Sequence, residues 1–556
     1  MTDNSIAFPR LDRSQIAALA PFATRRHFHD GQPLFQAGTS HGGFFIVLAG
    51  AVEIVDSSGT EPRTVALHGP GEFTGDIDIL SQRRSVVSAV ARGETDVLEV
   101  APDDIRRIIS EDPALGEIIL QAFVTRREQL LESGFQGIRV IGSGDSRDAY
   151  RIREFLDRNQ VPVRWIDVDT DPDAGEMLRR FGLDEAALPV VVCEGQPLLR
   201  NPSTRDLAKT VGLRQPMGQE VYDMVIVGAG PAGLAAAVYG SSEGLSTLLL
   251  DSYAPGGQAG SSTRIENYLG FPMGITGSDL TSRATLQAQK FGAKISTPSL
   301  VTALENDGPH MIVRLDDGDS ATAQCVLIAT GADYLRLDVP ERERFEGRGL
   351  YYAATPIELV SCSGADVVVV GAGNSAGQAV MFLARHTRRV LLLVRGDDLR
   401  KRMSSYLADR IGAAGNVEVL YNTEIRHMSG SERLETIEIE NTRTGETQTV
   451  STPAVFVFIG AVPRTDWLPA QIATNARGFI RTGRALADAP GWTLKREPFL
   501  LETSQPGVFA AGDVRLGSAR RVASAVGEGA MAVKLVHEYL AETHTEVSVG
   551  DSDDPR

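Results

Sequence analysis

Two glycine-rich fingerprints constrain this chain more than any other feature. Gly228-Ala-Gly-Pro-Ala-Gly233 follows the apolar run Met224–Val227, and Gly371-Ala-Gly-Asn-Ser-Ala376 follows Val367–Val370. Each fingerprint opens an alanine-rich stretch suited to a helix. In a strand–turn–helix unit, the glycines permit a tight turn and let backbone N–H groups approach a pyrophosphate at the helix N-terminus. Two such units predict two bound dinucleotides with electrons passing between them, which is the arrangement of an enzyme.

Length and net charge limit the number of domains and the kinds of partner that this chain can have. A chain of 556 residues should contain roughly three or four domains, because single cores stop growing beyond about 250–300 residues. The net charge of −17 argues against nucleic acid or an anionic membrane as a partner, since both attract a basic face. No secretory signal peptide or membrane-spanning stretch is evident, so a soluble cytoplasmic protein is expected.

Cysteine and histidine spacing predicts neither a disulfide framework nor a metal site. The three cysteines lie far apart in the sequence, and the nine histidines form no HExxH motif. His27 and His29 alternate as they would on a strand, and we expect both to face solvent.

Residues 1–133 carry many short β-like runs separated by glycine, proline and aspartate, followed by helical segments near 102–110 and 113–131. This pattern predicts a small β-barrel or jelly roll. The region resembles a cyclic-nucleotide-binding domain, on the basis of Gly50 and of a cassette that begins with Gly75 and Asp76 and ends with Arg84 and Ser85.

That resemblance implies a role for each end of the cassette. The carboxylate of Asp76 would meet the ribose 2′-hydroxyl, while Arg84 and Ser85 would hold the cyclic phosphate, because a guanidinium binds phosphate oxygens bidentately. The family's glutamate is an aspartate here, and the cassette is about one residue shorter. The alternative is a barrel retained only as an interaction or dimerisation module.

Residues 137–214 alternate between strand and helix patterns in the order βαβαβ, which predicts a small sheet with crossover helices. The region resembles glutaredoxin and thioredoxin, with Leu188-Pro189 matching the proline that is usually cis beside the redox site. The CxxC position of that family reads Ser146-Arg-Asp-Ala149. Without a thiol pair this region is expected to bind or dock rather than to exchange dithiols. Cys193 is expected to be a buried small hydrophobe.

Residues 221–545 resemble the low-molecular-weight thioredoxin reductase family. The first fingerprint is followed by a strand that ends in Asp251, and an acid about 20 residues on accepts hydrogen bonds from ribose hydroxyls. The resemblance therefore implies an α/β fold with an FAD-binding domain at 221–338 and 462–545. The residues that it places at FAD are Gly228, Gly230, Pro231, Ala232, Gly233, Asp251, Gly257, Gln258, Asn267, Thr330, Gly331, Gly512, Asp513, Arg520 and Arg521.

The second fingerprint lies in an inserted segment, 339–461, that the resemblance assigns to NAD(P)H. Its following strand ends in Arg395 rather than an acid, which favours the 2′-phosphate of NADPH over NADH, although Asp397 and Asp398 weaken the local positive charge. Residues 546–556 are expected to form a polar tail. The residues predicted to bind NAD(P)H are Gly371, Gly373, Asn374, Ser375, Ala376, Arg395 and Arg400.

One departure from the reductase family decides where electrons are expected to go. The family's CxxC position reads Ala353-Ala-Thr-Pro356, and Cys362 offers only a single thiol, for which a catalytic role is the less favoured reading. The leading hypothesis is a homodimeric oxidoreductase that passes electrons from NADPH to FAD and then to a ferredoxin-like protein, a quinone, oxygen or an external disulfide. The alternative is a redox sensor gated by a cyclic nucleotide or a partner, with little turnover.

Overall fold

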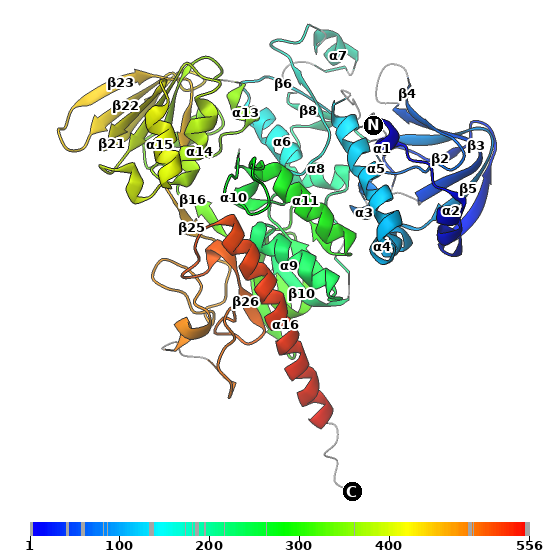
Figure 1. Ribbon diagram of the computed structural model, residues 1–556. Coiled ribbons are helices and arrows are strands. Elements are labelled where there is room, and N and C mark those ends of the chain that lie inside the picture. The colour runs from blue at the N-terminus through cyan, green and yellow to red at the C-terminus, as the bar shows by residue number, and fades with distance from the viewer. Residues whose placement is uncertain are drawn as a thin grey trace.

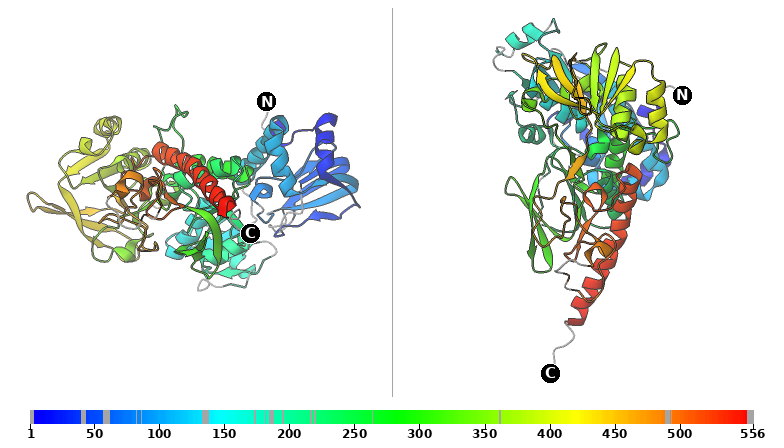
Figure 2. Two further views of the ribbon diagram at one scale, coloured as in Figure 1. Left: turned by 90° about the horizontal axis from the view of Figure 1, so that it is seen from below. Right: turned by 90° about the vertical axis from the view of Figure 1, so that its left-hand side faces the viewer.

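The structure is a computed structural model. It describes residues 4–39, 44–56, 62–81, 83–85, 87–132, 138–172, 174–180, 182–183, 188–193, 196–215, 217–218, 220–262, 264–360, 362–487, 492 and 494–550. Figure 1 and the left view of Figure 2 place the N-terminal barrel and an inserted nucleotide unit, which contains α14 (Asn374–Leu383) and α15 (Ser405–Ala413), on opposite sides of a central nucleotide unit. None of the described helices combines the length and apolarity needed to cross a bilayer.

The N-terminal barrel is built on two long antiparallel strands, β3 (Phe44–Asp56) and β5 (Ser88–Val100). Apolar side chains of the barrel meet those of the following helices, so that Phe44, Phe73 and Phe123 share one core. The predicted barrel and its two following helices are confirmed. The remaining elements are α1 (Asn4–Ala7), α2 (Arg13–Leu19), β1 (Ala23–Phe28), β2 (Pro33–Phe35), β4 (Arg63–His68), α3 (Asp78–Ser81), α4 (Pro102–Glu111) and α5 (Pro113–Glu132).

The small-sheet region, residues 138–215, has four strands in the order β7-β6-β8-β9. Strands β6 and β7 are parallel, and β8 returns antiparallel to β6, so the predicted βαβαβ alternation is present. The Leu188-Pro189 bond is cis, as predicted. Membership of the thioredoxin family stays a prediction for this region. Its elements are β6 (Ile138–Gly142), α6 (Arg147–Arg158), β7 (Arg164–Asp167), α7 (Ala174–Arg180), β8 (Val190–Cys193), β9 (Leu199–Arg200) and α8 (Thr204–Val211).

The first nucleotide unit has a seven-stranded sheet in the order β12-β11-β10-β15-β14-β13, with β26 paired to β15. The strands around β10 are parallel and buried on both sides, which explains their continuous apolar runs. Its elements are β10 (Val221–Val227), α9 (Pro231–Ser242), β11 (Thr247–Leu250), α10 (Gly257–Gly260), α11 (Gly277–Lys290), β12 (Lys294–Ser296), β13 (Val301–Asp307), β14 (His310–Leu315), β15 (Ser320–Ile328), β26 (Val508–Ala510) and α16 (Val522–Gly550).

The second nucleotide unit lies within the first, and a short antiparallel ribbon of β16 (Ala332–Tyr334) and β25 (Ala461–Pro463) connects the two. Its five-stranded sheet has the order β17-β24-β18-β19-β20, and all pairs in it are parallel. Its elements are α12 (Arg342–Phe345), β17 (Leu350–Tyr351), α13 (Pro356–Leu359), β18 (Asp366–Val370), α14 (Asn374–Leu383), β19 (Arg389–Val394), α15 (Ser405–Ala413), β20 (Val417–Tyr421), β21 (Thr423–Ser429), β22 (Thr436–Asn441), β23 (Thr447–Ser451) and β24 (Val455–Val457).

Helix α16 projects away from the body of the molecule in Figure 1 and in the right view of Figure 2. It continues to Gly550, so the first five residues of the predicted polar tail are helical. Residues 551–556 lie outside the described part of the chain. The domain limits expected from the sequence stay predictions.

Candidate functional site

The first fingerprint forms the turn between β10 and α9, and its glycines differ in the space around them. Gly228 has a φ of +107°, and a Cβ there would lie 2.4 Å from the carbonyl oxygen of Ala329. A Cβ on Gly233 would lie 1.8 Å from the carbonyl oxygen of Gly228, so only glycine lets the helix pack this close to the turn. A Cβ on Gly230 would meet no atom within 4 Å, which leaves open space at the helix N-terminus. This geometry fits a pyrophosphate.

Asp251 lies where β11 ends, beside this turn. One carboxylate oxygen accepts a hydrogen bond from the backbone N–H of Ala229 at 2.8 Å, and the other accepts from Tyr253 at 2.9 Å and Ala254 at 3.1 Å. These bonds fix the carboxylate next to the fingerprint while leaving lone pairs for ribose hydroxyls. The position agrees with the predicted role of Asp251 at the adenosine end of FAD.

The loop before α10 packs onto the same turn. The N–H of Gly256 donates to the carbonyl of Ala229 at 2.7 Å, and a Cβ on Gly257 would come within 3.0 Å of Gly230 Cα. The side-chain amide of Gln258 donates to the carbonyl of Ala332. The structure thus brings three separate predicted segments together around the first fingerprint.

Thr330 lies beside the ribbon that connects the two units, and Asn267 lies beside a contact with the second unit. The Thr330 hydroxyl donates to the carbonyl of Arg464 at 3.1 Å, and Asn267 is exposed. Next to Asn267, Glu266 forms an ion pair with Arg410 of α15 at 2.6 Å. Sequence reasoning missed this contact between the two units, because the partners are 144 residues apart.

The C-terminal segment completes the first site. Gly512 has a φ of +79°, and its N–H donates to Glu528 of α16 at 2.7 Å. Glu528 also pairs with Arg515, and both residues were missed by sequence reasoning. Burial raises the pKa of Asp513, an effect that Arg520 opposes.

The remaining residues predicted to bind FAD are Pro231, Ala232, Gly331, Arg520 and Arg521. Ala232 is buried beside Gly512, and Arg520 lies over the ring of Phe479. Arg520 and Arg521 are both exposed, so their predicted contact with the flavin stays a prediction. Pro231 occupies the first turn of α9, and Gly331 has a φ of +64°.

The second fingerprint repeats this geometry between β18 and α14. A Cβ on Gly371 would lie 2.4 Å from the carbonyl oxygen of Phe458, whereas a Cβ on Gly373 would meet no atom within 4 Å. The side chain of Asn374 accepts a hydrogen bond from the N–H of Ser404 at 2.7 Å. The buried Ala376 replaces the third glycine of the first fingerprint. The open space at Gly373, with Ser375 exposed in the first turn of α14, fits a second pyrophosphate.

The two predicted arginines of this unit differ in their surroundings. Arg400 is engaged in an ion pair with Asp409. Arg395 is exposed at the end of β19, and the described residues place no carboxylate in an ion pair with it. Lys401 pairs with Asp397 at 2.7 Å, which neutralises one of the two nearby acids. Arg395 is therefore better placed than Arg400 to receive a 2′-phosphate.

The segment Ala353–Pro356 follows β17 and ends at the first residue of α13, and Cys362, which follows that helix, is buried. Burial raises the pKa of the Cys362 thiol to about 12, with a further contribution from Glu358. A thiol with a raised pKa carries little thiolate at neutral pH. These surroundings argue against the catalytic role that the sequence left open for Cys362. All three cysteines are free and buried, as predicted for Cys193.

The cassette of the barrel faces the small-sheet region across a cavity. Gly75 has a φ of +107°, and the Asp76 carboxylate forms an ion pair with Arg127 of α5 at 3.1 Å, which sequence reasoning did not foresee. The Arg84 guanidinium donates a hydrogen bond to the carbonyl of Gly38 at 3.4 Å. The arginine predicted to hold the phosphate forms no ion pair with the described residues, while the carboxylate predicted to meet the ribose already has a partner. The cavity is lined by Ala37, Gly38, Asp78, Arg83, Arg84, Ser85, Arg127, Ile138, Val161, Pro162, Cys193, Gln196, Thr210 and Val211.

Comparison with known families agrees with this geometry. The profile for the pyridine nucleotide-disulphide oxidoreductases matches residues 222–529, more than half of the chain. The chain belongs to the pyridine nucleotide-disulphide oxidoreductase family. The profile of the cyclic nucleotide-binding domain matches residues 25–112, within the barrel.

Two curated relatives of this oxidoreductase each align with a little more than half of the chain. A thioredoxin reductase of Treponema pallidum is 34% identical over 325 residues, which are 57% of this chain and 97% of the relative. The 34.2 kDa protein in the rubredoxin operon of Clostridium pasteurianum is 33% identical over 327 residues, which are 58% and 98% of the two chains.

Two solved structures cover a similar share of this chain. The thioredoxin reductases of Lactococcus lactis and T. acidophilum each superpose with a TM-score of 0.52 at 28% identity, covering 58% of this chain and 99% and 100% of theirs. The thioredoxin reductase-like family uses FAD and NADPH, and the predicted cofactors and enzyme class are confirmed at this level. The residue assignments within the site stay predictions.

Proposed function

We propose that this oxidoreductase transfers electrons from NADPH to FAD and then to an acceptor that meets the flavin directly. The observation that carries the proposal is the segment Ala353–Pro356, which has no thiol where the thioredoxin reductases have two. When bound, the two cofactors supply the hydride and electron chemistry. The chain's own residues bind and orient them, with Asp251 at the first fingerprint and Arg395 at the second.

Contacts around this segment support the proposal. The hydroxyl of Tyr150, from α6 of the small-sheet region, donates to Glu358 at 2.8 Å. The other carboxylate oxygen of Glu358 accepts two hydrogen bonds from Thr355, both at 2.6 Å. Burial raises the pKa of Glu358, which these hydrogen bonds oppose. A buried, hydrogen-bonded carboxyl group and a tyrosine thus occupy the neighbourhood of the missing thiols.

The acceptor is proposed to be a small redox protein, with a quinone, oxygen or an external disulfide as alternatives. A relative from Clostridium pasteurianum is named for its place in a rubredoxin operon, and rubredoxin is a small electron carrier. Such an acceptor needs no thiol on the reductase.

Anaerobic stopped-flow spectroscopy tests this proposal. NADPH should reduce the bound flavin, and a small iron–sulfur protein should reoxidise it faster than a quinone or an external disulfide does. The Cys362→Ser variant should behave like the unmodified enzyme at both steps. A variant that is reduced normally but is no longer reoxidised would contradict direct transfer from the flavin.

We further propose that the barrel regulates this reaction through the small-sheet region. Asn159, which follows α6, is buried and contacts three parts of the chain. Its backbone carbonyl accepts from Arg83 of the cassette at 3.3 Å, and its side-chain amide donates to the carbonyl of Tyr253 at 3.1 Å. Its side-chain oxygen accepts from the hydroxyl of Thr297 at 3.1 Å. Since the N–H of Tyr253 donates to Asp251, these bonds form a continuous path from the cassette to the predicted FAD ribose site.

A second contact brings the cassette and the small-sheet region together. Gly212 ends α8 with a φ of +74°, and a Cβ there would lie 3.1 Å from the backbone nitrogen of Arg84. The side chain of Gln215 donates to the carbonyl of Ser81 at 3.3 Å. A ligand at Arg84 would therefore act on the packing of this region. This route favours the second candidate function, a redox protein gated by a cyclic nucleotide.

The Asn159→Ala variant tests the route. Cyclic AMP or cyclic GMP should change the rate of flavin reduction in the unmodified enzyme and leave that rate unchanged in Asn159→Ala, although the nucleotide still binds. Asn416→Ala is a matched control, because the Asn416 side chain also donates to two backbone carbonyls, at 2.8 and 3.3 Å, but within the second unit alone. An Asn159→Ala variant that responds like this control would refute the route. Absence of nucleotide binding to the full chain would leave the barrel as a docking module.

We also propose that the enzyme is a homodimer. Residues 268–273 form an apolar loop on the first unit, in which Tyr268 stacks on Phe271. Leu269 and Met273 are 93% and 76% exposed, more than the other large hydrophobic side chains of the described chain. Light scattering should show a dimer that the Leu269→Glu and Met273→Glu double variant dissociates, and an unchanged mass would exclude this loop as the contact.

A further inference from the structure

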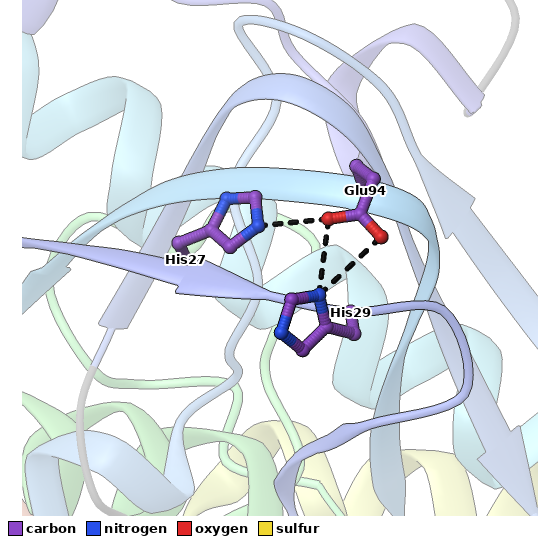
Figure 3. Close-up of side chains that lie close together, drawn as sticks. All are labelled: His27, His29 and Glu94. Atoms are coloured by element: carbon purple, nitrogen blue, oxygen red, sulfur yellow. Dashed lines mark hydrogen bonds and ion pairs between the residues drawn. The ribbon is translucent and has the colours of Figure 1, made fainter.

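A cluster of two histidines and one glutamate lies on the outer surface of the barrel. His27 belongs to β1, His29 follows that strand, and Glu94 belongs to β5 (Figure 3). All three side chains are exposed. Within the described part of the chain, this is the one group of three histidine, cysteine or carboxylate side chains whose ligand atoms all lie within 4.8 Å of one another.

The separations within this cluster suit a metal ion. His27 Nε2 lies 2.8 Å from Glu94 Oε2, and His29 Nδ1 lies 3.1 and 3.3 Å from the two oxygens of Glu94. Ligands at about 2.0–2.2 Å from a tetrahedral zinc ion are separated by roughly 3.3–3.5 Å. Only small side-chain rotations are therefore needed for all three groups to bind one ion.

Asp96 orients the ring of His27. Its carboxylate lies 2.9 Å from His27 Nδ1 and is also paired with Arg25 at 2.9 Å. A neutral imidazole has a single N–H, and donating it to Asp96 leaves a lone pair on Nε2 facing Glu94. Either a proton or a metal ion must then lie between Nε2 and the glutamate. Histidine ligands of metals are typically held by a carboxylate in this way.

The backbone holds the cluster in place. His27 pairs with Asp96 in the antiparallel register of β1 and β5. At the adjoining turns, the N–H of Gly93 donates to the side chain of Asp30 at 2.7 Å, and the N–H of His29 donates to Gln32 at 3.1 Å. Two of the three ligands therefore lie on paired strands, and the third, His29, lies in the turn that follows β1 and is held by these hydrogen bonds.

We propose that His27, His29 and Glu94 bind one divalent transition-metal ion, with Zn²⁺ as the favoured occupant. Two imidazoles and one carboxylate suit Zn²⁺, Cu²⁺ and Ni²⁺ better than Mg²⁺ or Ca²⁺, which prefer oxygen ligands. The fourth position is open to water. Sequence reasoning predicted no metal site and could not find this one, because 65 residues separate Glu94 from the nearer histidine.

Equilibrium dialysis of the full FAD-loaded chain against micromolar Zn²⁺, with metal content measured by mass spectrometry, tests this site. The unmodified protein should retain one Zn²⁺ that the His27→Ala and His29→Ala double variant does not retain. His427→Ala is the matched control, because His427 is also an exposed histidine on a strand, and it should retain the ion. Equal retention by the double variant and the control would overturn the proposal, as would the absence of bound Zn²⁺ from the unmodified protein, which would indicate an ion pair only.

The Asp96→Asn variant separates the ligands from the residue that positions them. This variant keeps all three ligands, so it should still bind one Zn²⁺, but with a dissociation constant about 10–100-fold higher. An unchanged dissociation constant would contradict the role of Asp96 in orienting His27. Because none of these measurements depends on NADPH oxidation, failure of the proposed electron transfer would leave their outcome unaffected.

Discussion

The two fingerprint turns of this oxidoreductase share one backbone design and differ in the residue that ends the neighbouring strand. At the first turn, Asp251 is held by three backbone hydrogen bonds beside the fingerprint. At the second turn, Arg395 is exposed and forms no ion pair with the described residues. An acid fixed in place suits ribose hydroxyls, whereas a free guanidinium suits an added phosphate. The residue that follows the neighbouring strand therefore distinguishes the predicted FAD site from the predicted NADPH site.

The helix packing behind the two turns also differs. Gly233 brings α9 so close to its turn that a methyl group would overlap a carbonyl oxygen, while Ala376 shows that α14 tolerates a methyl group at the matching position. The first turn is therefore the more sensitive of the two to added volume.

The largest expected effect comes from Gly233→Ala. Overpacking of this kind typically costs about 1–3 kcal/mol of folding free energy, and it would displace the turn that we expect to hold the FAD pyrophosphate. We expect the variant to be purified with little or no flavin, as measured by the ratio of flavin to protein absorbance. The reverse change, Ala376→Gly, should leave flavin content and NADPH binding near normal. Full flavin content in Gly233→Ala would contradict the assignment of FAD to the first turn.

A smaller effect is expected at the second turn. Arg395→Ala should raise the dissociation constant for NADPH about tenfold or more, since a hydrogen bond to a charged group contributes about 1.5–3 kcal/mol. Affinity for NADH should change little, because NADH has no 2′-phosphate. Arg400→Ala is the control and should have a weaker effect, because Arg400 is paired with Asp409. Isothermal titration with both nucleotides measures these changes, and equal losses for NADPH and NADH would remove Arg395 from the 2′-phosphate site.

These contrasts show what a single sequence can predict. Local motifs were predicted well, because the residues that make a fingerprint turn or end a strand are neighbours in the chain. Sequence reasoning missed two ion pairs, Asp76–Arg127 and Arg400–Asp409. Both depend on how helices pack onto the sheets. A motif therefore predicts which residues could bind a ligand, but not which of them already have partners.

The contacts between regions were the least predictable part. Tyr150 and Glu358 meet although 208 residues separate them, and Asn159 meets Thr297 across 138 residues. The alternating pattern of residues 137–214 predicted the order from β6 to β8 correctly but missed β9 and α8. It contained no information on which surface of that region would face the nucleotide units.

Near neutral pH the smallest expected effect comes from a buried histidine of the barrel, which makes stability depend on pH. His68 is buried in the barrel, and burial lowers its pKa from 6.5 to about 3. The unfolded chain therefore binds one more proton than the folded chain between these values, and stability decreases as the pH falls below 6.5, by at most about 1.4 kcal/mol per pH unit. Thermal unfolding of the unmodified protein and of His68→Leu across this range should show a flatter pH dependence in the variant. Parallel curves would exclude His68 as the cause.

Direct transfer from the flavin to the acceptor is the central claim, and counting electrons tests it. A flavin alone accepts two electrons, and a flavin coupled to a redox-active disulfide accepts four. An anaerobic titration of the oxidised enzyme with dithionite, followed by flavin absorbance and a thiol assay, therefore measures the capacity of each subunit. We predict two electrons per FAD and no newly formed thiols. A capacity of four electrons per FAD, accompanied by two new thiols, would contradict the account.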